Sequence, residues 1–135
     1  NKQGRLDMAY VTAIVMLALV QYFYFSIEVG RARGRFGIAA PAISGNEEFE
    51  RYFRAQQNTL EQLAMFIPAI YATAYYGNPL YAAAAGVVFL IGRMLYFRSY
   101  VKEPSSRTLG FMLSMVPSLG MVIAALVLSC MTFMG

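Results

Sequence analysis

The stretch FERYFRAQQNTLEQ, residues 49–62, decides the fold, because it joins a polar segment directly to a long apolar run. It contains two arginines, two glutamates and an asparagine. Beyond Glu61, no Asp, Glu, Lys or Arg occurs before Arg93. A charged side chain that faces lipid near the middle of a membrane is costly. The polar residues at the start of this run therefore require a partner other than lipid.

Three uncharged stretches indicate a membrane protein. Of the 135 residues, 59% are hydrophobic and 13% are charged, whereas soluble domains carry about 25% charged residues. The uncharged stretches cover residues 8–27, 62–92 and 108–135, and a helix needs about 20 apolar residues to cross a membrane. Gly77-Asn78-Pro79 favours a turn and divides the middle stretch. The sequence therefore predicts an all-α integral membrane protein, a four-transmembrane-helix bundle that forms one domain over residues 1–135.

The expected spans alternate with short connections, apart from one longer polar segment. That segment, Glu28–Tyr52, contains several glycines and a proline and is expected to be a loop, although its start up to Phe36 could continue the first helix. The expected spans are Met8–Ile27, Phe53–Tyr75, Leu80–Tyr100 and Thr108–Met134.

The basic residues orient the chain in the membrane. Four spans place both termini on one side, and only Lys2 and Arg5 lie there. Nine of the eleven basic residues lie with the 1–2 and 3–4 connections on the other side, which the positive-inside rule places in the cytoplasm. Because these residues flank spans, the net charge of +4 indicates orientation and contact with anionic membrane lipid, not nucleic acid. The nine are Arg31, Arg33, Arg35, Arg51, Arg54, Arg93, Arg98, Lys102 and Arg107.

The composition also limits cofactors. The chain has no histidine, and its single cysteine, Cys130, cannot form an internal disulfide. Zinc and haem sites with the usual ligand sets are therefore not expected, and no metal ligand is assigned.

Two polar faces within the spans are open to two interpretations. Arg54, Asn58 and Glu61 are spaced i, i+4, i+7 on one helix face. They point at protein, at a water-filled cavity or at a ligand, because an ionisable group facing lipid at mid-membrane costs at least about 2.5 kcal/mol. One interpretation is an ion pair of Glu61 with Arg54 or Arg93 that holds the bundle together. The other is a binding site for a small, multiply charged ligand.

The second face favours the ligand interpretation. Arg93, Tyr96 and Tyr100 are spaced i, i+3, i+7 and lie toward the same expected cytoplasmic end. Together the two faces offer more donors and acceptors than one ion pair uses. Taken alone, the two tyrosines also suit the interfacial aromatic belt of a membrane protein.

These residues carry a resemblance to a known family. FERYFRAQQNTLE, residues 49–61, resembles the glutathione-binding signature of the MAPEG family (membrane-associated proteins in eicosanoid and glutathione metabolism). RMLYFRSY, residues 93–100, followed by Arg107, resembles the second part of that signature. The resemblance spans nearly the whole chain. It implies a homotrimer of four-helix subunits, with glutathione bound between neighbouring protomers and open to the cytoplasm.

The resemblance assigns roles to eight positions. It implies that Arg54 and Arg33 hold carboxylates of glutathione, for which a guanidinium is suited, and that Glu61 holds its ammonium group. Gln56 matches a supporting polar position. Arg107 matches the arginine that activates the thiol. The positions that match glutathione-binding residues are Arg33, Arg54, Asn58, Glu61, Tyr96, Tyr100 and Arg107.

The expected activity follows from the thiol. A free thiol with a pKa of about 8.5 is only a few per cent thiolate at pH 7, and a fixed guanidinium stabilises the anion. The resemblance thus implies a membrane-bound glutathione S-transferase that detoxifies lipophilic electrophiles, with possible peroxidase activity toward lipid hydroperoxides. At Gly34 and Gln62 the sequence differs from the leukotriene-synthesising branch of the MAPEG family, which has an arginine and a ligand-contacting tyrosine at these positions.

Two rival functions remain open at this point. The first is a non-catalytic lipid-binding scaffold of the same family, which would be expected to lack parts of the glutathione signature. The second is a small transporter or channel. Its polar faces would have to line a continuous path, but Ala82–Leu90 and Phe111–Leu128 offer no polar continuation.

Overall fold

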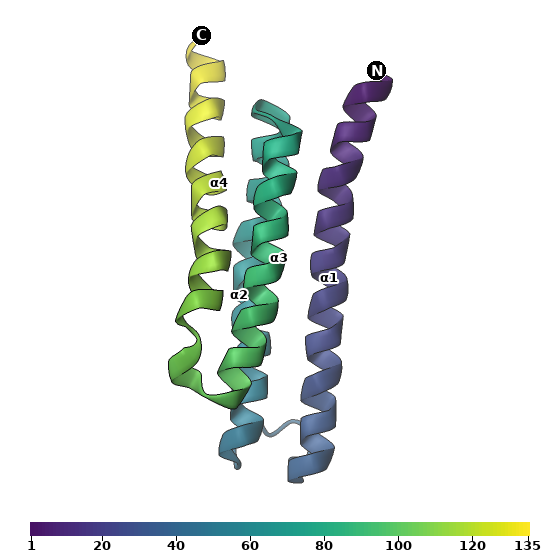
Figure 1. The fold of residues 1–135 in the computed structure, drawn as a ribbon, viewed down its shortest axis with the longest axis vertical. Coiled ribbons are helices and arrows are strands. Elements are labelled where there is room, and N and C mark those ends of the chain that lie inside the picture. The colour runs from purple at the N-terminus through teal and green to yellow at the C-terminus, as the bar shows by residue number, and fades with distance from the viewer.

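The computed structural model describes residues 1–135 and consists of four long α-helices that lie side by side (Figure 1). Both termini lie at one end of the bundle, and the α1–α2 and α3–α4 connections lie at the other (Figure 1). The elements are α1 (Lys2–Phe36), α2 (Glu47–Tyr76), α3 (Pro79–Lys102), the short 3-10 helix η1 (Pro104–Ser106) and α4 (Thr108–Met134). The predicted all-α four-helix architecture is confirmed.

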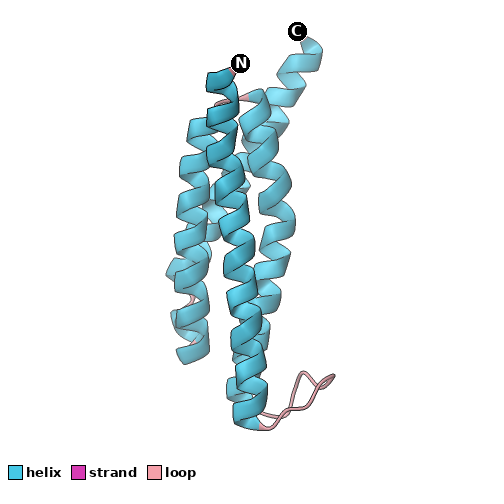
Figure 2. Ribbon diagram, turned by 90° about the vertical axis from the view of Figure 1, so that its right-hand side faces the viewer, coloured by secondary structure: helices cyan, strands magenta, loops and turns pink.

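The helix ends explain why the first two helices are longer than the expected spans. α1 continues to Phe36, and Gly37 ends it with a φ of 69° in the left-handed region. Asn46 caps α2 by accepting a hydrogen bond from the Phe49 N–H at 2.9 Å. Glu47, Glu48 and Glu50 in the first turn complement the positive end of the helix dipole. The expected loop Glu28–Tyr52 is therefore reduced to Gly37–Asn46, the loop that Figure 2 shows projecting from the bundle.

Aromatic and small residues fill the centre of the bundle. The rings of Phe66 on α2 and Phe89 on α3 stack with centroids 3.8 Å apart, and both side chains are fully buried. Val11 and Val15 of α1 belong to the same cluster. Nearer the connection end, Phe25 of α1 stacks on Phe97 of α3 at 4.1 Å. These contacts hold α1, α2 and α3 in fixed register.

Two glycines bring α3 and α4 into close contact. A Cβ atom at Gly110 would overlap the backbone of Tyr96, and one at Gly92 would lie 2.6 Å from the Ser114 nitrogen. Only glycine permits this approach, as small residues commonly do between membrane helices. The contact fixes the position of Tyr96 relative to the start of α4.

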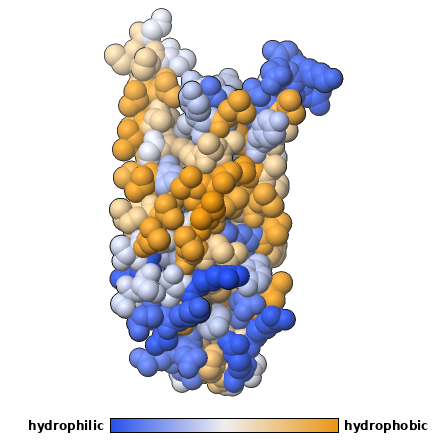
Figure 3. Space-filling view, in the orientation of Figure 1, coloured by the Kyte–Doolittle hydropathy of each residue, from blue (hydrophilic) through white to orange (hydrophobic).

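Three helices, α1, α3 and α4, are long and apolar enough to cross a membrane. On the face shown in Figure 3, apolar residues cover the middle of the molecule and hydrophilic residues cover the connection end. α2 does not reach this apolar length, so the predicted span Phe53–Tyr75 differs from the other three. The reason is its first half, Glu47–Gln62, which carries six charged residues. Its apolar remainder, Leu63–Tyr76, is about 21 Å long at a helix rise of about 1.5 Å per residue.

Candidate functional site

The polar face of α2 forms one wall of a pocket near the connection end of the bundle. The pocket has a volume of about 510 Å³, within the range of about 300–1,000 Å³ typical of small-molecule sites. α2 supplies five of the lining residues, α3 two, the α1–α2 loop one, and the residue between η1 and α4 one. The lining residues are Ile43, Phe53, Arg54, Gln57, Asn58, Glu61, Tyr96, Tyr100 and Arg107.

The pocket brings together six of the eight residues that the sequence indicated. They come from three separate segments, so only the fold makes them neighbours. The six are Arg54, Asn58, Glu61, Tyr96, Tyr100 and Arg107.

The charged residues of the pocket are not paired with one another. Arg54 and Glu61 are exposed, and the only ion pair in the structure joins Arg31 to Glu28 at 3.3 Å. The structure therefore lacks the ion pair of Glu61 with Arg54 or Arg93 that one interpretation of the sequence required. The charged groups remain available to a ligand.

Arg93 instead lies behind the pocket, fully buried. Its guanidinium donates to Asn58 Oδ1 at 2.8 Å, to Thr59 Oγ1 at 2.8 Å and to Ser114 Oγ at 3.0 Å. It also lies 4.3 Å from the centroid of the Tyr96 ring. The group thus links α2, α3 and α4 through neutral partners.

The two tyrosines form one aromatic wall. Their ring centroids are 5.5 Å apart and the ring planes differ by 20°. Tyr96 is buried and Tyr100 is half-buried. Both line the pocket, so these residues are more than members of an interfacial belt.

Arg107 lies where the chain enters α4. Its Nη1 donates to the Pro104 carbonyl at 3.0 Å, and the side chain is exposed. No side chain caps α4, so the first-turn amides of that helix keep donors free at its positive end. An adjoining hollow of about 420 Å³ is lined by Asn58, Tyr96, Arg107, Thr108 and Phe111. An anion placed there would meet both the guanidinium and the helix end.

Arg33 lies outside this pocket. Its Nη1 donates to the Ala42 carbonyl at 2.7 Å and to the Ile38 carbonyl at 3.4 Å. Its guanidinium also lies 5.0 Å from the Phe49 ring centroid. Arg33 therefore anchors the α1–α2 loop, the segment that carries Ile43 to the pocket.

Gln56 also lies outside the pocket, and its neighbour Gln57 lies in it. Gln56 Nε2 donates to Ser26 Oγ at 2.8 Å, toward α1. Sequence reasoning missed Gln57, although the spacing of residues 54, 57, 58 and 61 follows one helix face and indicates it. Ile43 and Phe53 were also missed, and for Ile43 no local signal exists because a loop carries it.

Gln62, the departure from the related signature, is buried rather than exposed to the pocket. Its Oε1 has no hydrogen-bond partner. The next residue along the helix from Glu61 thus points into the bundle, as the helical rotation of about 100° per residue requires.

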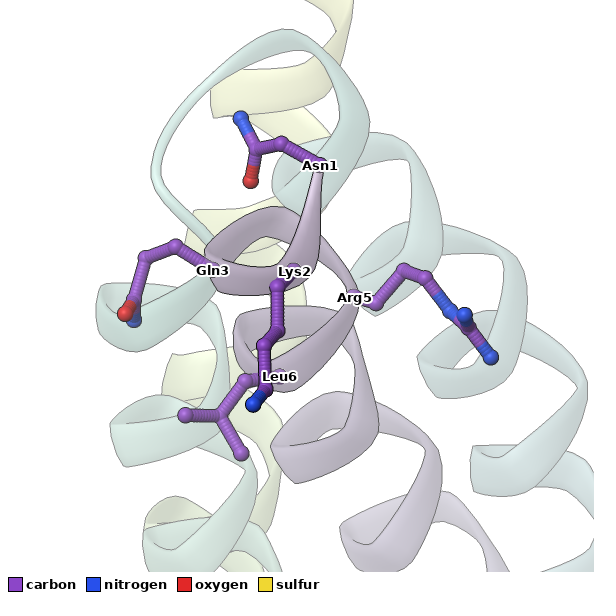
Figure 4. A pocket seen from close by; sticks show the side chains of 5 residues that line it. All are labelled: Asn1, Lys2, Gln3, Arg5 and Leu6. Atoms are coloured by element: carbon purple, nitrogen blue, oxygen red, sulfur yellow. The ribbon is translucent and has the colours of Figure 1, made fainter.

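Two other hollows lie elsewhere. One of about 1020 Å³ surrounds the first turn of α1, where the side chains of Asn1, Gln3 and Arg5 point in different directions (Figure 4). The other, of about 730 Å³, is an almost wholly apolar groove between α1 and α2 that shares Glu61 with the polar pocket. Neither gathers a set of convergent polar groups like that of the polar pocket.

The fold and the pocket together define a multi-pass membrane protein whose helices enclose a polar, multiply charged site at one end. A protein-family model of the MAPEG family matches residues 11–127 of the sequence. The chain therefore belongs to the MAPEG family.

Individual relatives share most of their length with this chain. An uncharacterized protein of Synechocystis sp. is 42% identical over 120 residues, which cover 89% of this chain and 88% of that protein. Microsomal glutathione S-transferase 2 of Homo sapiens is 39% identical over 105 residues, 78% of this chain and 71% of that protein. Leukotriene C4 synthase of Bos taurus is 31% identical over 101 residues, 75% of this chain and 67% of that protein.

Proposed function

We propose that the protein is a membrane-bound glutathione S-transferase, which activates glutathione as the thiolate and conjugates it to lipophilic electrophiles. The observation that carries the proposal is the pocket of about 510 Å³, where six of the eight indicated residues converge with their charges unpaired. Relatives named glutathione S-transferase support the same activity. Residues 1–135 then form one MAPEG domain.

The charges of the pocket suit glutathione. The tripeptide carries two carboxylates and one ammonium group at neutral pH, and the pocket offers the cations Arg54 and Arg107 and the anion Glu61. Arg54 would bind a carboxylate through its guanidinium, and Glu61 would accept hydrogen bonds from the ammonium. Asn58 and the tyrosine hydroxyl groups would hydrogen-bond the peptide groups.

Arg107 would stabilise the thiolate. Arginine stays charged and cannot act as a general base, so the thiol proton leaves to solvent while the guanidinium and the free end of α4 stabilise the sulfur anion. A pKa lowered by about two units, equal to about 2.7 kcal/mol, makes the thiolate the majority species. The thiolate sulfur then forms a bond to the electrophilic carbon as the leaving group departs.

A homotrimer would complete the site. Arg33 and Gln56 match positions of the glutathione signature but lie outside the pocket of their own protomer. A neighbouring protomer would supply Arg33, with glutathione bound between the two, and Gln56 would support the site from behind through its hydrogen bond to Ser26. In the membrane, α2 would be the fourth span, because it packs against α1, α3 and α4 along the bundle. The site would face the cytoplasm and the termini the opposite side.

Conjugation measured with purified protein in detergent tests the proposal. Glutathione and chlorodinitrobenzene should give the thioether with release of chloride, and Arg107→Leu should reduce kcat by at least about 100-fold, in line with loss of about 2.7 kcal/mol of thiolate stabilisation. Arg98→Leu is the matched control, because Arg98 is exposed and lies outside the pocket. Unchanged turnover in the Arg107 variant would overturn the role of this residue. A wild-type protein that binds no glutathione would point to the lipid-binding scaffold.

A further inference from the structure

Arg93 is a buried cation without a counter-ion. Its side chain is fully buried and contacts no carboxylate. Placing an arginine in such surroundings is expensive unless its donors are satisfied, and an apolar residue of similar size is often equally stable there. A purely structural link between helices therefore gives little reason for a charged residue at this position.

The three acceptors around Arg93 are not equivalent. Thr59 accepts from Arg93, and its hydroxyl donates to the Ala55 carbonyl at 2.9 Å. Ser114 likewise accepts from Arg93 and donates to backbone, at 3.1 Å from the Gly110 carbonyl. Each of these two hydroxyl groups therefore both accepts and donates a hydrogen bond within the protein.

Asn58 differs because it also lines the pocket. Arg93 Nη2 donates to Asn58 Oδ1 at 2.8 Å, and since arginine has no acceptor, this bond fixes which way the amide is turned. The Asn58 NH₂ group donates to no protein acceptor in the structure. It is the part of the amide that remains for a ligand.

We propose that Arg93 is a positioning residue for the ligand, which locks the Asn58 amide with its NH₂ group available to glutathione and supports the ring of Tyr96 from behind. The proposal rests on the proposed function, because it names the ligand as glutathione. Arg93 itself touches neither glutathione nor the reacting sulfur. Its effect passes through two pocket residues, Asn58 at 2.8 Å and the Tyr96 ring at 4.3 Å.

The steady-state constants separate positioning from support of the fold. Without Arg93, the Asn58 amide turns freely and the NH₂ group loses its fixed direction, so binding of glutathione weakens. Arg107 is untouched, so turnover at saturating glutathione persists. A residue that only supported the fold would instead lower the amount of active enzyme, which reduces kcat and leaves the KM for glutathione unchanged.

The experiment measures conjugation of chlorodinitrobenzene by wild type, Arg93→Met, Arg93→Lys and Ser114→Ala. Arg93→Met should raise the KM for glutathione about tenfold, equal to about 1.4 kcal/mol, with kcat within about threefold of wild type. Arg93→Lys keeps a donor for Asn58 and should give a smaller rise of about threefold. Ser114→Ala removes one Arg93 bond away from the pocket, so its KM should stay within about twofold.

An unchanged KM in Arg93→Met, or in Arg93→Lys if only that variant folds, would overturn the proposal. An equal rise of KM in Ser114→Ala would also overturn it, because that variant leaves Asn58 bound. These outcomes are distinct from failure of the proposed function, in which the wild-type protein itself would bind no glutathione.

Discussion

Arg54 and Glu61 lie two turns apart on the same face of α2 and line one pocket, yet they form no ion pair. Both side chains are exposed. Neither charge therefore stabilises the folded chain through an ion pair. Replacing either residue should change the affinity for the ligand and leave the stability of the fold unchanged. These two residues therefore test the site most directly.

Glu61→Gln should weaken glutathione binding without loss of stability. The change removes the anion that would meet the ammonium group, and a hydrogen bond to a charged group contributes about 1.5–3 kcal/mol, so the Kd should rise at least about tenfold. Isothermal titration with glutathione measures the Kd, and a thermal melt checks the fold.

Glu48→Gln is the control for this change, because Glu48 is exposed and does not line the pocket. It should bind glutathione like the wild type. If Glu61→Gln and Glu48→Gln gave the same Kd as wild type, Glu61 would not contact the ligand.

The two adjacent glutamines should separate stability from binding. Gln57→Leu removes a pocket side chain that makes no hydrogen bond in the protein, so the Kd for glutathione should rise by about threefold with no change in the melting temperature. Gln56→Leu removes the 2.8 Å hydrogen bond to Ser26 and should lower stability by about 1 kcal/mol. Thermal melts that were equal for the two variants would contradict this division.

The helices and one face of the site could be predicted from the sequence, because the signals for them are local. The uncharged stretches and the basic residues predicted four helices with both termini at one end, and the structure has this arrangement. The spacing of Arg54, Asn58 and Glu61 predicted a shared face, because helical periodicity is local. That face lines the pocket.

Other features depend on contacts between distant segments. Arg93 is buried against Ser114, which lies 21 residues away on the next helix. The spacing of Arg93, Tyr96 and Tyr100 on α3 alone would instead place Arg93 on the face that lines the pocket. Ile43 lines the pocket from the α1–α2 loop, where no helical pattern could place it. α2 begins well before its apolar part, because Asn46 caps it, and Asn46 belongs to no hydrophobic pattern.

Arg33→Ala should release the α1–α2 loop. The variant loses the hydrogen bonds to the Ala42 and Ile38 carbonyls, so amide exchange in residues 38–45 should accelerate about tenfold, equal to about 1.4 kcal/mol of local stability. Hydrogen–deuterium exchange with mass spectrometry measures this change. Arg31→Ala is the control, since Arg31 pairs only with Glu28 on its own helix. Equal exchange in the two variants would mean that Arg33 does not anchor the loop.

Gly110→Ala should separate α3 from α4. The added methyl group would overlap the backbone of Tyr96, and such overpacking typically costs about 1–3 kcal/mol. Because Tyr96 lines the pocket, the affinity for glutathione should fall with the melting temperature.

Gly120→Ala in the same helix is the matched control. A Cβ atom there meets nothing within 4 Å, so the change should leave stability equal or raise it by about 0.5–1 kcal/mol through helix propensity. Gly110→Ala with the melting temperature and affinity of Gly120→Ala would show that the close contact is not needed.

In the proposed mechanism the pocket binds glutathione as the thiolate, which Arg107 stabilises. Ultraviolet difference absorbance of the purified, detergent-solubilised protein, titrated with glutathione at neutral pH, tests it most directly. A thiolate band should saturate in the wild type and be lost in Arg107→Leu, while this variant still binds glutathione. Binding of glutathione without a thiolate band in the wild type, or an equal band in Arg107→Leu, would contradict it.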